Sequence, residues 1–418
     1  MNMIHSLLSQ FLEKSAQEWQ RMKPGLERIQ AACEALGNPE KKIRIIHIAG
    51  TNGKGSVAAM LQSILSEAGL KVGLFTSPHL LRVNERFRIG NEEISDGELE
   101  KYLNQIVGAM HLQLSFFEFC TLMAFLYFAE QKVDVAILET GLGGRLDATN
   151  VGIPLISVIT EIGLDHTEIL GTDITSIARE KAGIIKTGIP VVCGASHPEA
   201  RRVIEEVASS VGANLVFAQG DHKDRPYNFT YKLNLVGFHQ IQNAKIVLKT
   251  IEVLNSLRIF SNISEEAVEA GFANVRWPGR MEWVSRDPPI LLDGAHNVDG
   301  MRALVESLKI LESPKKWRIL FSAVSDKQVN EMISCLQEIA SEIVICKMKN
   351  LRSIDPEKIL APVGAIHELP LRVANDSAQA FHQIKKSLRV DEGILITGSL
   401  YFIGELKGVL NEANPTNG

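Results

Sequence analysis

The 418-residue sequence predicts an α/β protein of two domains, each built on a mostly parallel sheet covered by helices. Short segments rich in β-branched residues alternate with amphipathic segments along nearly the whole chain, the order typical of parallel sheets. A glycine-rich turn, residues 50–56, joins the first such strand to a helix. The length also exceeds what one hydrophobic core usually accommodates, so we expect two or three domains.

The first domain is expected to span residues 1–284. Its expected strands are residues 43–49, 71–76, 133–139, 155–160 and 190–193, and its expected helices are residues 54–68, 95–107, 117–130 and 174–181, with another from about residue 241. Ser95 and Glu98 have the spacing of a capping box. The strand ending at Glu139 is otherwise wholly apolar and therefore belongs in the middle of a sheet. Residues 228–236 alternate as an antiparallel strand does, after an irregular polar stretch.

The second domain is expected to span residues 285–418. Two proline-containing turns, WPG and DPP, bracket a short strand within residues 276–289, and we place the boundary there. Strands and helices then alternate afresh, with strands in ILLD, RILFSAV, EIVICKM and GILITG. The tail from Asn411 is expected to fray.

Composition excludes several classes of protein. Lys and Arg number 44 and Asp and Glu 49, a formal net charge of −5, without the basic blocks that follow a nucleic-acid backbone. Five cysteines stand far apart without CxxC spacing and are expected to be reduced thiols in the cytoplasm. The N-terminal residues predict a surface helix and not a signal, and the longest apolar run is shorter than a membrane span. We expect neither a nucleic-acid nor a membrane partner.

The segment IRIIHIAGTNGKGS, residues 43–56, has the pattern of a phosphate-binding loop. Its glycines permit backbone conformations closed to other residues, so N–H groups can converge on phosphate oxygens beside a helix N-terminus. Lys54 is expected to reach the β- and γ-phosphates and Ser56 the magnesium ion. The candidate nucleotide-binding residues of the loop are Gly50, Thr51, Asn52, Gly53, Lys54, Gly55 and Ser56. Because Gly55 separates the lysine from the hydroxyl, a glycine-rich turn that binds nothing stays an alternative.

Polar side chains follow other strands at the same expected edge of the sheet. Ser77 follows the second strand, Glu139 ends the third, and Asp165 with His166 follows the fourth. A cation that bridges phosphates prefers oxygen ligands, and a neutral imidazole can join them. We therefore predict a metal site here. The alternatives are a solvated carboxylate at a strand end and a loop histidine that only forms hydrogen bonds.

Three further groups of charged residues have both a functional and a structural interpretation. Arg145 and Asp147, in ETGLGGRLDATN, are expected to hold an anionic substrate and a polar ring, or else to form a surface ion pair with each other. Lys181 ends a helix, where its charge favours the helix dipole. The segment DGAHN, residues 293–297, ends a strand and opens a helix, as an N-cap does.

Ten motifs, taken in order, resemble those of the folylpolyglutamate synthase family, which includes bifunctional dihydrofolate synthases and belongs to the Mur-ligase superfamily. They are HIAGTNGKGS, TSPHLLRVNER, SFFEF, ETGLGGRLDATN, ITEIGLDHTEILG, REKAGIIK, HQIQNA, WPGRME, LLDGAHN and GILITGSLYFIGEL. The resemblance runs nearly end to end. It implies an ATP-dependent amide ligase of folate biosynthesis and one-carbon metabolism. The implied fold is a large P-loop domain of the Mur-ligase central type followed by a smaller Rossmann-like domain.

The resemblance also implies roles for individual residues. The metal ligands would be Ser56, Ser77, Glu139 and His166, and Lys181 would be carbamylated near a second magnesium ion. Asn243 matches the adenine contact, and Arg280, Asp293 and His296 match nucleotide contacts reached across the domain interface. The pterin site would comprise Arg28, Ser115, Phe117, Leu146, Asp147 and Ala148. Lys54, Lys181, His166 and Arg280 are the candidate catalytic residues.

The implied reaction adds L-glutamate to reduced folates, and to 7,8-dihydropteroate in bifunctional members. The acceptor carboxylate attacks the γ-phosphorus of ATP to give an acyl phosphate, and the amine of glutamate then displaces phosphate. Lys54, Arg280 and magnesium would stabilise the developing charge. Ser115 stands where some bifunctional members carry threonine, so the dihydropteroate activity stays open. Family members are often monomers, and we expect a monomer.

Two alternatives remain at this point. A cell-wall ligase of the same superfamily generally carries a further N-terminal domain, for which the 49 residues before Gly50 leave little room. A P-loop nucleotide switch without ligase chemistry would give RLDATN and SFFEF no role.

Overall fold

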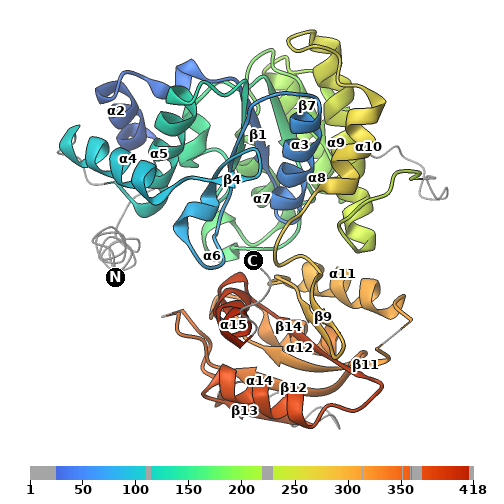
Figure 1. Cartoon of the computed structure of the whole chain (residues 1–418). Coiled ribbons are helices and arrows are strands. Elements are labelled where there is room, and N and C mark those ends of the chain that lie inside the picture. Colours follow the sequence, from blue (N-terminus) through green and yellow to red (C-terminus); the bar gives the residue numbers. More distant parts are fainter. Residues whose placement is uncertain are drawn as a thin grey trace. The chain divides into compact units, whose positions relative to one another are not determined.

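The computed structural model describes residues 25–109, 114–218, 229–312, 314–350, 352–357, 359 and 370–413. Two compact α/β units are present, each on its own sheet (Figure 1). Unit 1 comprises Met1–Ser77, Val83–Lys232 and Gln242–Val275, and unit 2 comprises Pro78–Arg82, Leu233–Ile241 and Arg276–Gly418, as far as each range is described. The division expected after residue 284 falls within a strand of the unit 2 sheet, β9 (Glu282–Arg286).

The sheet of unit 1 has the strand order β4-β3-β2-β5-β1-β6-β7-β8. Its strands are β1 (Ile45–Ala49), β2 (Val72–Phe75), β3 (Phe87–Ile89), β4 (Glu92–Glu93), β5 (Val135–Glu139), β6 (Ile156–Ile159), β7 (Val191–Cys193) and β8 (Leu215–Phe217). All neighbours are parallel except the short antiparallel edge of β3 and β4. The predicted parallel sheet and the central position of β5 are confirmed. Strands β3, β4 and β8 were not predicted, because they are short and mostly half-buried or exposed, whereas the equally short β7 is fully buried and apolar.

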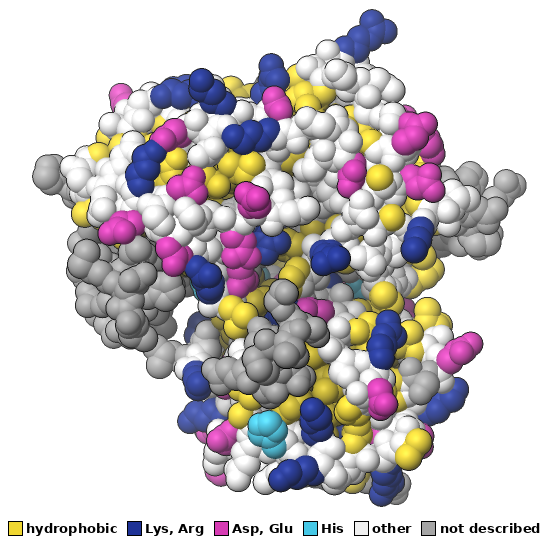
Figure 2. Space-filling view, viewed as in Figure 1, with side chains coloured by type: hydrophobic (Ala, Val, Ile, Leu, Met, Phe, Trp, Pro, Cys, Tyr) yellow, Lys and Arg dark blue, Asp and Glu magenta, His cyan; other side chains and the backbone are white. Residues whose placement is uncertain are grey.

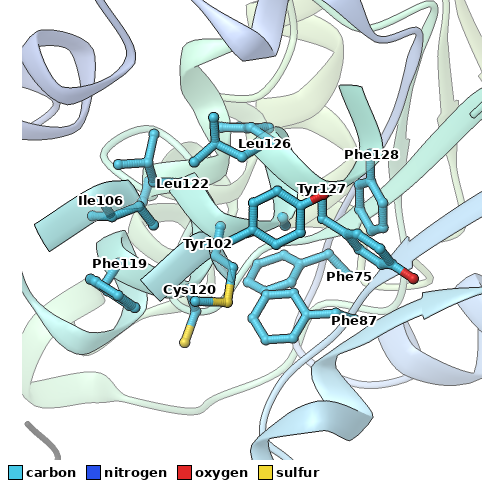
Figure 3. Close-up of a cluster of buried hydrophobic side chains, with 14 of the residues drawn as sticks. Phe75, Phe87, Tyr102, Ile106, Phe119, Cys120, Leu122, Leu126, Tyr127 and Phe128 are labelled. Atoms are coloured by element: carbon cyan, nitrogen blue, oxygen red, sulfur yellow. The ribbon is translucent and has the colours of Figure 1, made fainter. Parts of the chain in front are cut away.

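Helices cover both faces of this sheet. They are α2 (Glu27–Ala35), α3 (Lys54–Glu67), α4 (Asp96–Ala109), α5 (Phe116–Glu130), α6 (Thr167–Leu170), α7 (Ile174–Ala182), α8 (Pro198–Ser210), α9 (Phe238–Leu257) and α10 (Glu265–Asn274). α5 is apolar almost all round and is accordingly buried between β2 and its helical neighbours, where Phe75, Phe87 and Tyr102 join its side chains (Figure 3). The predicted capping box is present, since Glu98 N–H donates to Ser95 Oγ and Ser95 N–H to Glu98 Oε2.

The strand predicted over residues 228–236 is wrong for the described part, residues 229–236. The alternating side chains meet a helix there and no neighbouring strand. The rings of Phe229 and Tyr231 pack on Phe272 of α10, with centroids 5.6 and 5.5 Å away. The predicted N-terminal helix, the irregular stretch of residues 219–226 and the end of the tail lie outside the described residues.

The sheet of unit 2 has the order β13-β12-β11-β14-β10-β9, with only β9 antiparallel. The remaining strands are β10 (Pro289–Leu292), β11 (Lys316–Phe321), β12 (Ala340–Cys346), β13 (Leu371–Ala374) and β14 (Glu392–Thr397), and the helices are α11 (Val298–Lys309), α12 (Val329–Leu336), α14 (Ser377–Lys386) and α15 (Leu400–Ala413). The predicted strands are confirmed, and β13 was not predicted. No helix in the described part of the chain is long and apolar enough to cross a bilayer.

Candidate active site

The turn between β1 and α3 has the conformation that its glycines predict. Gly53 has a φ of 90°, and a Cβ there would lie 2.3 Å from Asn243 Oδ1, so the predicted adenine contact lies against the turn. A Cβ on Gly50 would lie 1.8 Å from Thr160 Oγ1. Thr51 and Asn52 N–H both donate to Glu161 O, at 2.8 and 3.2 Å. Gly55 and Ser56 are buried in the first turn of α3. The turn is thus fixed to the loop that follows β6.

Two lysines converge on one carbonyl of this turn. Lys54 Nζ donates to Gly50 O at 3.1 Å and to Thr51 O at 3.3 Å, and Lys181 Nζ donates to Gly50 O at 2.7 Å. Lys181 is only 4% exposed, so it does not act as a solvated lysine at a helix end. Its burial, followed by the nearby charge of Lys54, lowers its pKa to about 7, against the opposite effects of Asp165 and Asp147.

The structure brings two of the four predicted metal ligands into direct contact. Ser77 N–H donates to Glu139 Oε2 at 3.1 Å; Ser77 follows β2, and Glu139 is the last residue of the neighbouring strand β5. His166 opens α6 in the left-handed conformation, with a φ of 50°, and its N–H donates to Asp165 Oδ1 at 2.8 Å. Among the described residues, no three His, Cys, Asp or Glu side chains form a ready metal cluster. A cation held here would therefore need hydroxyl, phosphate or water ligands as well.

Asp147 closes the loop in which it lies. Its Oδ2 accepts the N–H groups of Gly141 and Leu142 at 2.8 and 2.9 Å, and its Oδ1 accepts Thr149 N–H at 3.0 Å. Burial raises the pKa of Asp147, and these hydrogen bonds act in the opposite direction. The alternative of an ion pair with Arg145 is wrong, because the Arg145 Nη2 is 2.8 Å from Glu180 Oε1 at the surface. Leu146 and Ala148 flank Asp147, and Ala148 is buried in the short 3-10 helix η3 (Ala148–Val151).

Three of the predicted pterin-site residues meet around the start of α5. Ser115 is the N-cap, and its N–H donates to Glu118 Oε2 at 2.7 Å. Arg28 Nη2 lies 3.0 Å from Glu118 Oε1. The Phe117 ring lies against Gly141, where a Cβ would come within 2.6 Å of it. Glu118 was not predicted as a site residue, although its Ser-x-x-Glu spacing from Ser115 is the signal of a capping box.

The remaining predicted residues belong to unit 2. Asp293 follows β10 and accepts Met281 N–H and Ala295 N–H at 2.9 and 2.8 Å. Arg280 lies against Gly294, whose carbonyl is 2.9 Å from His296 Nδ1. The N-cap of α11 expected in DGAHN is Asn297.

Sequence reasoning also missed His239 of unit 2. Burial is the largest influence on this side chain and lowers its pKa, Asp293 raises it and Arg280 lowers it. The motif HQIQNA that contains His239 was noted only for Asn243. The structure therefore adds a half-buried imidazole that interacts electrostatically with Arg280 and Asp293.

Comparison with known proteins identifies both parts of the chain. The Mur ligase middle domain matches residues 48–251, and the Mur ligase glutamate ligase domain matches residues 279–400. The dihydrofolate synthase/folylpolyglutamate synthase of Bacillus subtilis is 41% identical over 411 residues, which is 92% of this chain and 95% of that protein.

Two solved structures extend the match. FolC of Escherichia coli in complex with DHPP and ADP has a TM-score of 0.86 and 30% identity, and the match covers 98% of each chain. A bifunctional folylpolyglutamate synthase/dihydrofolate synthase with Mn, AMPPNP and L-glutamate bound has a TM-score of 0.83 and 33% identity, covering 93% of this chain and 95% of that one.

Proposed function

Because this chain belongs to the dihydrofolate synthase/folylpolyglutamate synthase family of ATP-dependent ligases, we propose that it joins L-glutamate to reduced folates and to 7,8-dihydropteroate, releasing ADP and phosphate. The observation that carries the proposal is the glycine turn with Lys54 and Lys181 on one carbonyl, beside the Glu139 and Ser77 pair. Phosphoryl transfer depends mainly on positioning and charge stabilisation, and these groups supply both.

In the proposed mechanism the N–H groups at the start of α3, residues 53–56, bind the phosphates of ATP, because Thr51 and Asn52 N–H already donate to Glu161 O. Lys54 exchanges its carbonyl partners for the β- and γ-phosphates, and Asn243 contacts the adenine. Arg280, Asp293 and His296 are proposed as further nucleotide contacts, with Arg280 stabilising charge in the transition state.

Magnesium, when bound, would neutralise the charge that develops on the transferred phosphoryl group. We propose that Ser56, Ser77, Glu139 and His166 hold it. The fit is supported by the oxygen-rich donor set and by the contact between Ser77 and Glu139. These side chains would supply hydroxyl and carboxylate oxygens and one imidazole nitrogen to the ion.

Lys181 is proposed to carry a carbamate that faces a second magnesium site. An unprotonated amine attacks CO₂, so that an N–C bond forms and a proton is lost. A pKa of about 7 leaves much of the Lys181 amine unprotonated at neutral pH. Enzyme equilibrated with ¹³C-bicarbonate should therefore show a carbamate ¹³C resonance that is absent in Lys181→Ala. An unlabelled wild-type enzyme would contradict the modification.

The acceptor is proposed to bind between the Asp147 loop and the start of α5. Phe117 offers an aromatic face for the pterin ring, and Arg28 and Ser115 meet beside it through Glu118. Leu146, Asp147 and Ala148 would form the opposite wall. The solved FolC structure that holds DHPP together with ADP supports an acceptor that binds alongside the nucleotide.

The proposed function is tested by phosphate release from ATP with each acceptor in turn, with and without L-glutamate. We expect turnover only when glutamate and a reduced folate or dihydropteroate are both present. Formation of dihydrofolate decides the second activity, and its absence would leave folate polyglutamylation alone. ATP hydrolysis at the same rate with and without either acceptor would favour a nucleotide switch.

Lys54→Ala should reduce ligation at least ~10³-fold while leaving the fold intact, because it removes the cation that stabilises the transferred phosphoryl group. Far-ultraviolet circular dichroism and the thermal unfolding curve check the fold. The matched control is Lys101→Ala, at an exposed lysine on α4, which should keep full activity. Near-normal turnover of Lys54→Ala would remove Lys54 from the site.

We further propose a monomer in the cytoplasm without nucleic-acid or membrane partners. On the face in Figure 2, basic and acidic side chains of the described residues are interspersed and form no continuous basic stripe. Light scattering should give the mass of one chain.

A further inference from the structure

A histidine lies buried in the middle of the central strand of unit 1. His47 is 1% exposed on β1 and stands opposite Leu138 of β5 and Ser157 of β6. Its Nε2 is 2.8 Å from Thr149 Oγ1. Burying an imidazole costs the free energy of its contacts with water, and the hydrogen bond to Thr149 offsets part of that cost. Nothing in the proposed reaction uses it directly.

The direction of this hydrogen bond follows from its neighbours. The Thr149 hydroxyl donates to Asp147 Oδ1. A hydroxyl has one proton, so it must accept from His47, whose Nε2 therefore carries the hydrogen. Asp147 Oδ1 also accepts Thr149 N–H, and Oδ2 accepts the N–H groups of Gly141 and Leu142. These hydrogen bonds of the carboxylate thus go to residues of its own loop.

We propose that His47 is a positioning residue for the acceptor substrate, because its Nε2–H fixes the Thr149 hydroxyl and through it the Asp147 carboxylate that shapes residues 141–149. This inference rests on the proposed function, because it assumes that the acceptor binds against the loop of residues 141–149. Gly141 also touches the Phe117 ring, so the same network sets the distance between the loop and the start of α5.

The imidazole acts here as a neutral donor. Burial, and then the charge of Lys186, lower the pKa of His47 to about 3, so it stays neutral at physiological pH. His47 lies on β1 three residues before Gly50, which directly follows the strand. One rigid strand thus carries both the nucleotide turn and the group that positions the acceptor loop, which aligns the acceptor carboxylate with the γ-phosphate.

Three variants separate positioning from general stability. In His47→Gln the side-chain amide reaches the place of Nε2, in His47→Asn it reaches only the place of Nδ1, and His47→Leu has no donor. We expect His47→Leu and His47→Asn to raise the KM for the acceptor roughly tenfold, the cost of about one buried hydrogen bond, with the KM for ATP nearly unchanged. His47→Gln should restore most of the loss. Equal losses for both substrates, or a Gln variant no better than Asn, would overturn the proposal.

Hydrogen exchange tests the same network without catalysis. The amides of Gly141, Leu142 and Thr149 should exchange faster in His47→Asn than in the wild type and regain protection in His47→Gln. Unchanged exchange would refute the positioning role, even in an active enzyme. If the wild type instead lacks activity on every folate while the exchange pattern holds, the proposed function fails and the network stands. Should His47→Leu not fold, the Gln and Asn pair decides alone.

Discussion

At the scale of single residues, Lys181 carries the most consequential change in chemistry. An amine that is ordinarily protonated to pH 10.5 has a pKa of about 7 because it is buried and lies near Lys54. Between these two values the unfolded chain binds a proton that the folded, unmodified protein does not bind. Stability should therefore rise with pH from about 7 toward 10.5, the opposite of a lysine held in an ion pair.

The predicted rise of stability with pH can be measured by comparing the wild type with Lys181→Met. In CO₂-free buffer, the unfolding free energy of the wild type should increase relative to that of Lys181→Met by roughly 1 kcal/mol per pH unit from pH 7 to 9.5. Urea unfolding followed by circular dichroism gives both curves, and groups that titrate equally in the two proteins cancel in the difference. Lys101→Met, at an exposed position, should run parallel to the wild type. Parallel curves for Lys181→Met would mean that Lys181 is protonated when folded.

At the scale of an element, the β1–α3 turn depends on a glycine that contacts another helix. Gly53→Ala would place a Cβ 2.3 Å from Asn243 Oδ1, at a φ of 90° that costs an L-residue ~1–2 kcal/mol. We expect the affinity for Mg–ADP to fall about tenfold or more, measured by calorimetry, because both the turn and the proposed adenine contact must shift.

Gly108→Ala is the matched control for that substitution. Gly108 lies in α4 with no atom within 4 Å of the added Cβ. It should leave nucleotide affinity unchanged and stabilise the helix by up to ~1 kcal/mol. An equal loss of affinity in both variants, or none in Gly53→Ala, would argue against a nucleotide site at this turn.

The elements also mark the limit of what the sequence predicts. β1, β5 and α5 were predictable because burial and periodicity are local, and the glycine turn because its spacing encodes its conformation. β13 was missed because four half-buried residues carry little pattern. The contacts of Glu118 with Arg28, and of His47 with Thr149, join residues 90 and 102 positions apart, which only the folded chain specifies.

At the scale of the whole molecule, each unit has a hydrophobic core of its own. In unit 2 the central strand β14 divides its side chains between two clusters, with Leu395 on one face of the sheet and Ile394 and Ile396 on the other. Unit 1 has separate clusters around α5 and around α7 and α8. Separate cores favour separate unfolding transitions, so one midpoint should not describe the protein.

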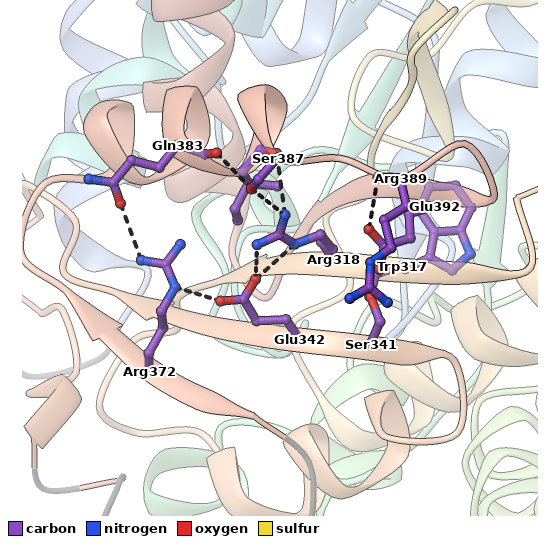
Figure 4. A network of polar contacts seen from close by, with 10 residues as sticks. Trp317, Arg318, Ser341, Glu342, Arg372, Gln383, Ser387, Arg389 and Glu392 are labelled. Carbon is purple, nitrogen blue, oxygen red and sulfur yellow. Dashed lines mark hydrogen bonds and ion pairs between the residues drawn. The ribbon is translucent and has the colours of Figure 1, made fainter.

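An ion-pair network in unit 2 gives the unfolding transition of this unit a pH dependence of its own, by which it can be distinguished from that of unit 1. Glu342 of β12 accepts from Arg372 Nε at 2.6 Å and from Arg318 Nε at 2.8 Å, so it joins β11, β12 and β13 (Figure 4). Burial raises the pKa of Glu342, but the hydrogen bonds and charges of the two arginines outweigh burial and lower it below 4.5. The carboxylate therefore stabilises unit 2 above the pKa of the unfolded chain, and this stabilisation is lost as the pH falls through the lower, folded value.

Glu342→Gln should lower the unfolding free energy of unit 2 by about 1–2 kcal/mol at pH 7, and the difference from the wild type should shrink as the pH drops below 4.5. Tryptophan fluorescence reports mainly on this transition, because three of the four tryptophans, Trp277, Trp283 and Trp317, belong to unit 2, and the Trp19→Phe background removes the fourth. Glu338→Gln removes an exposed pair with Lys309 and should cost less than ~0.5 kcal/mol. A difference that stays constant down to pH 3 would mean that Glu342 is not stabilised as a carboxylate. A shift in the transition of unit 1 as well would show that the two units unfold together.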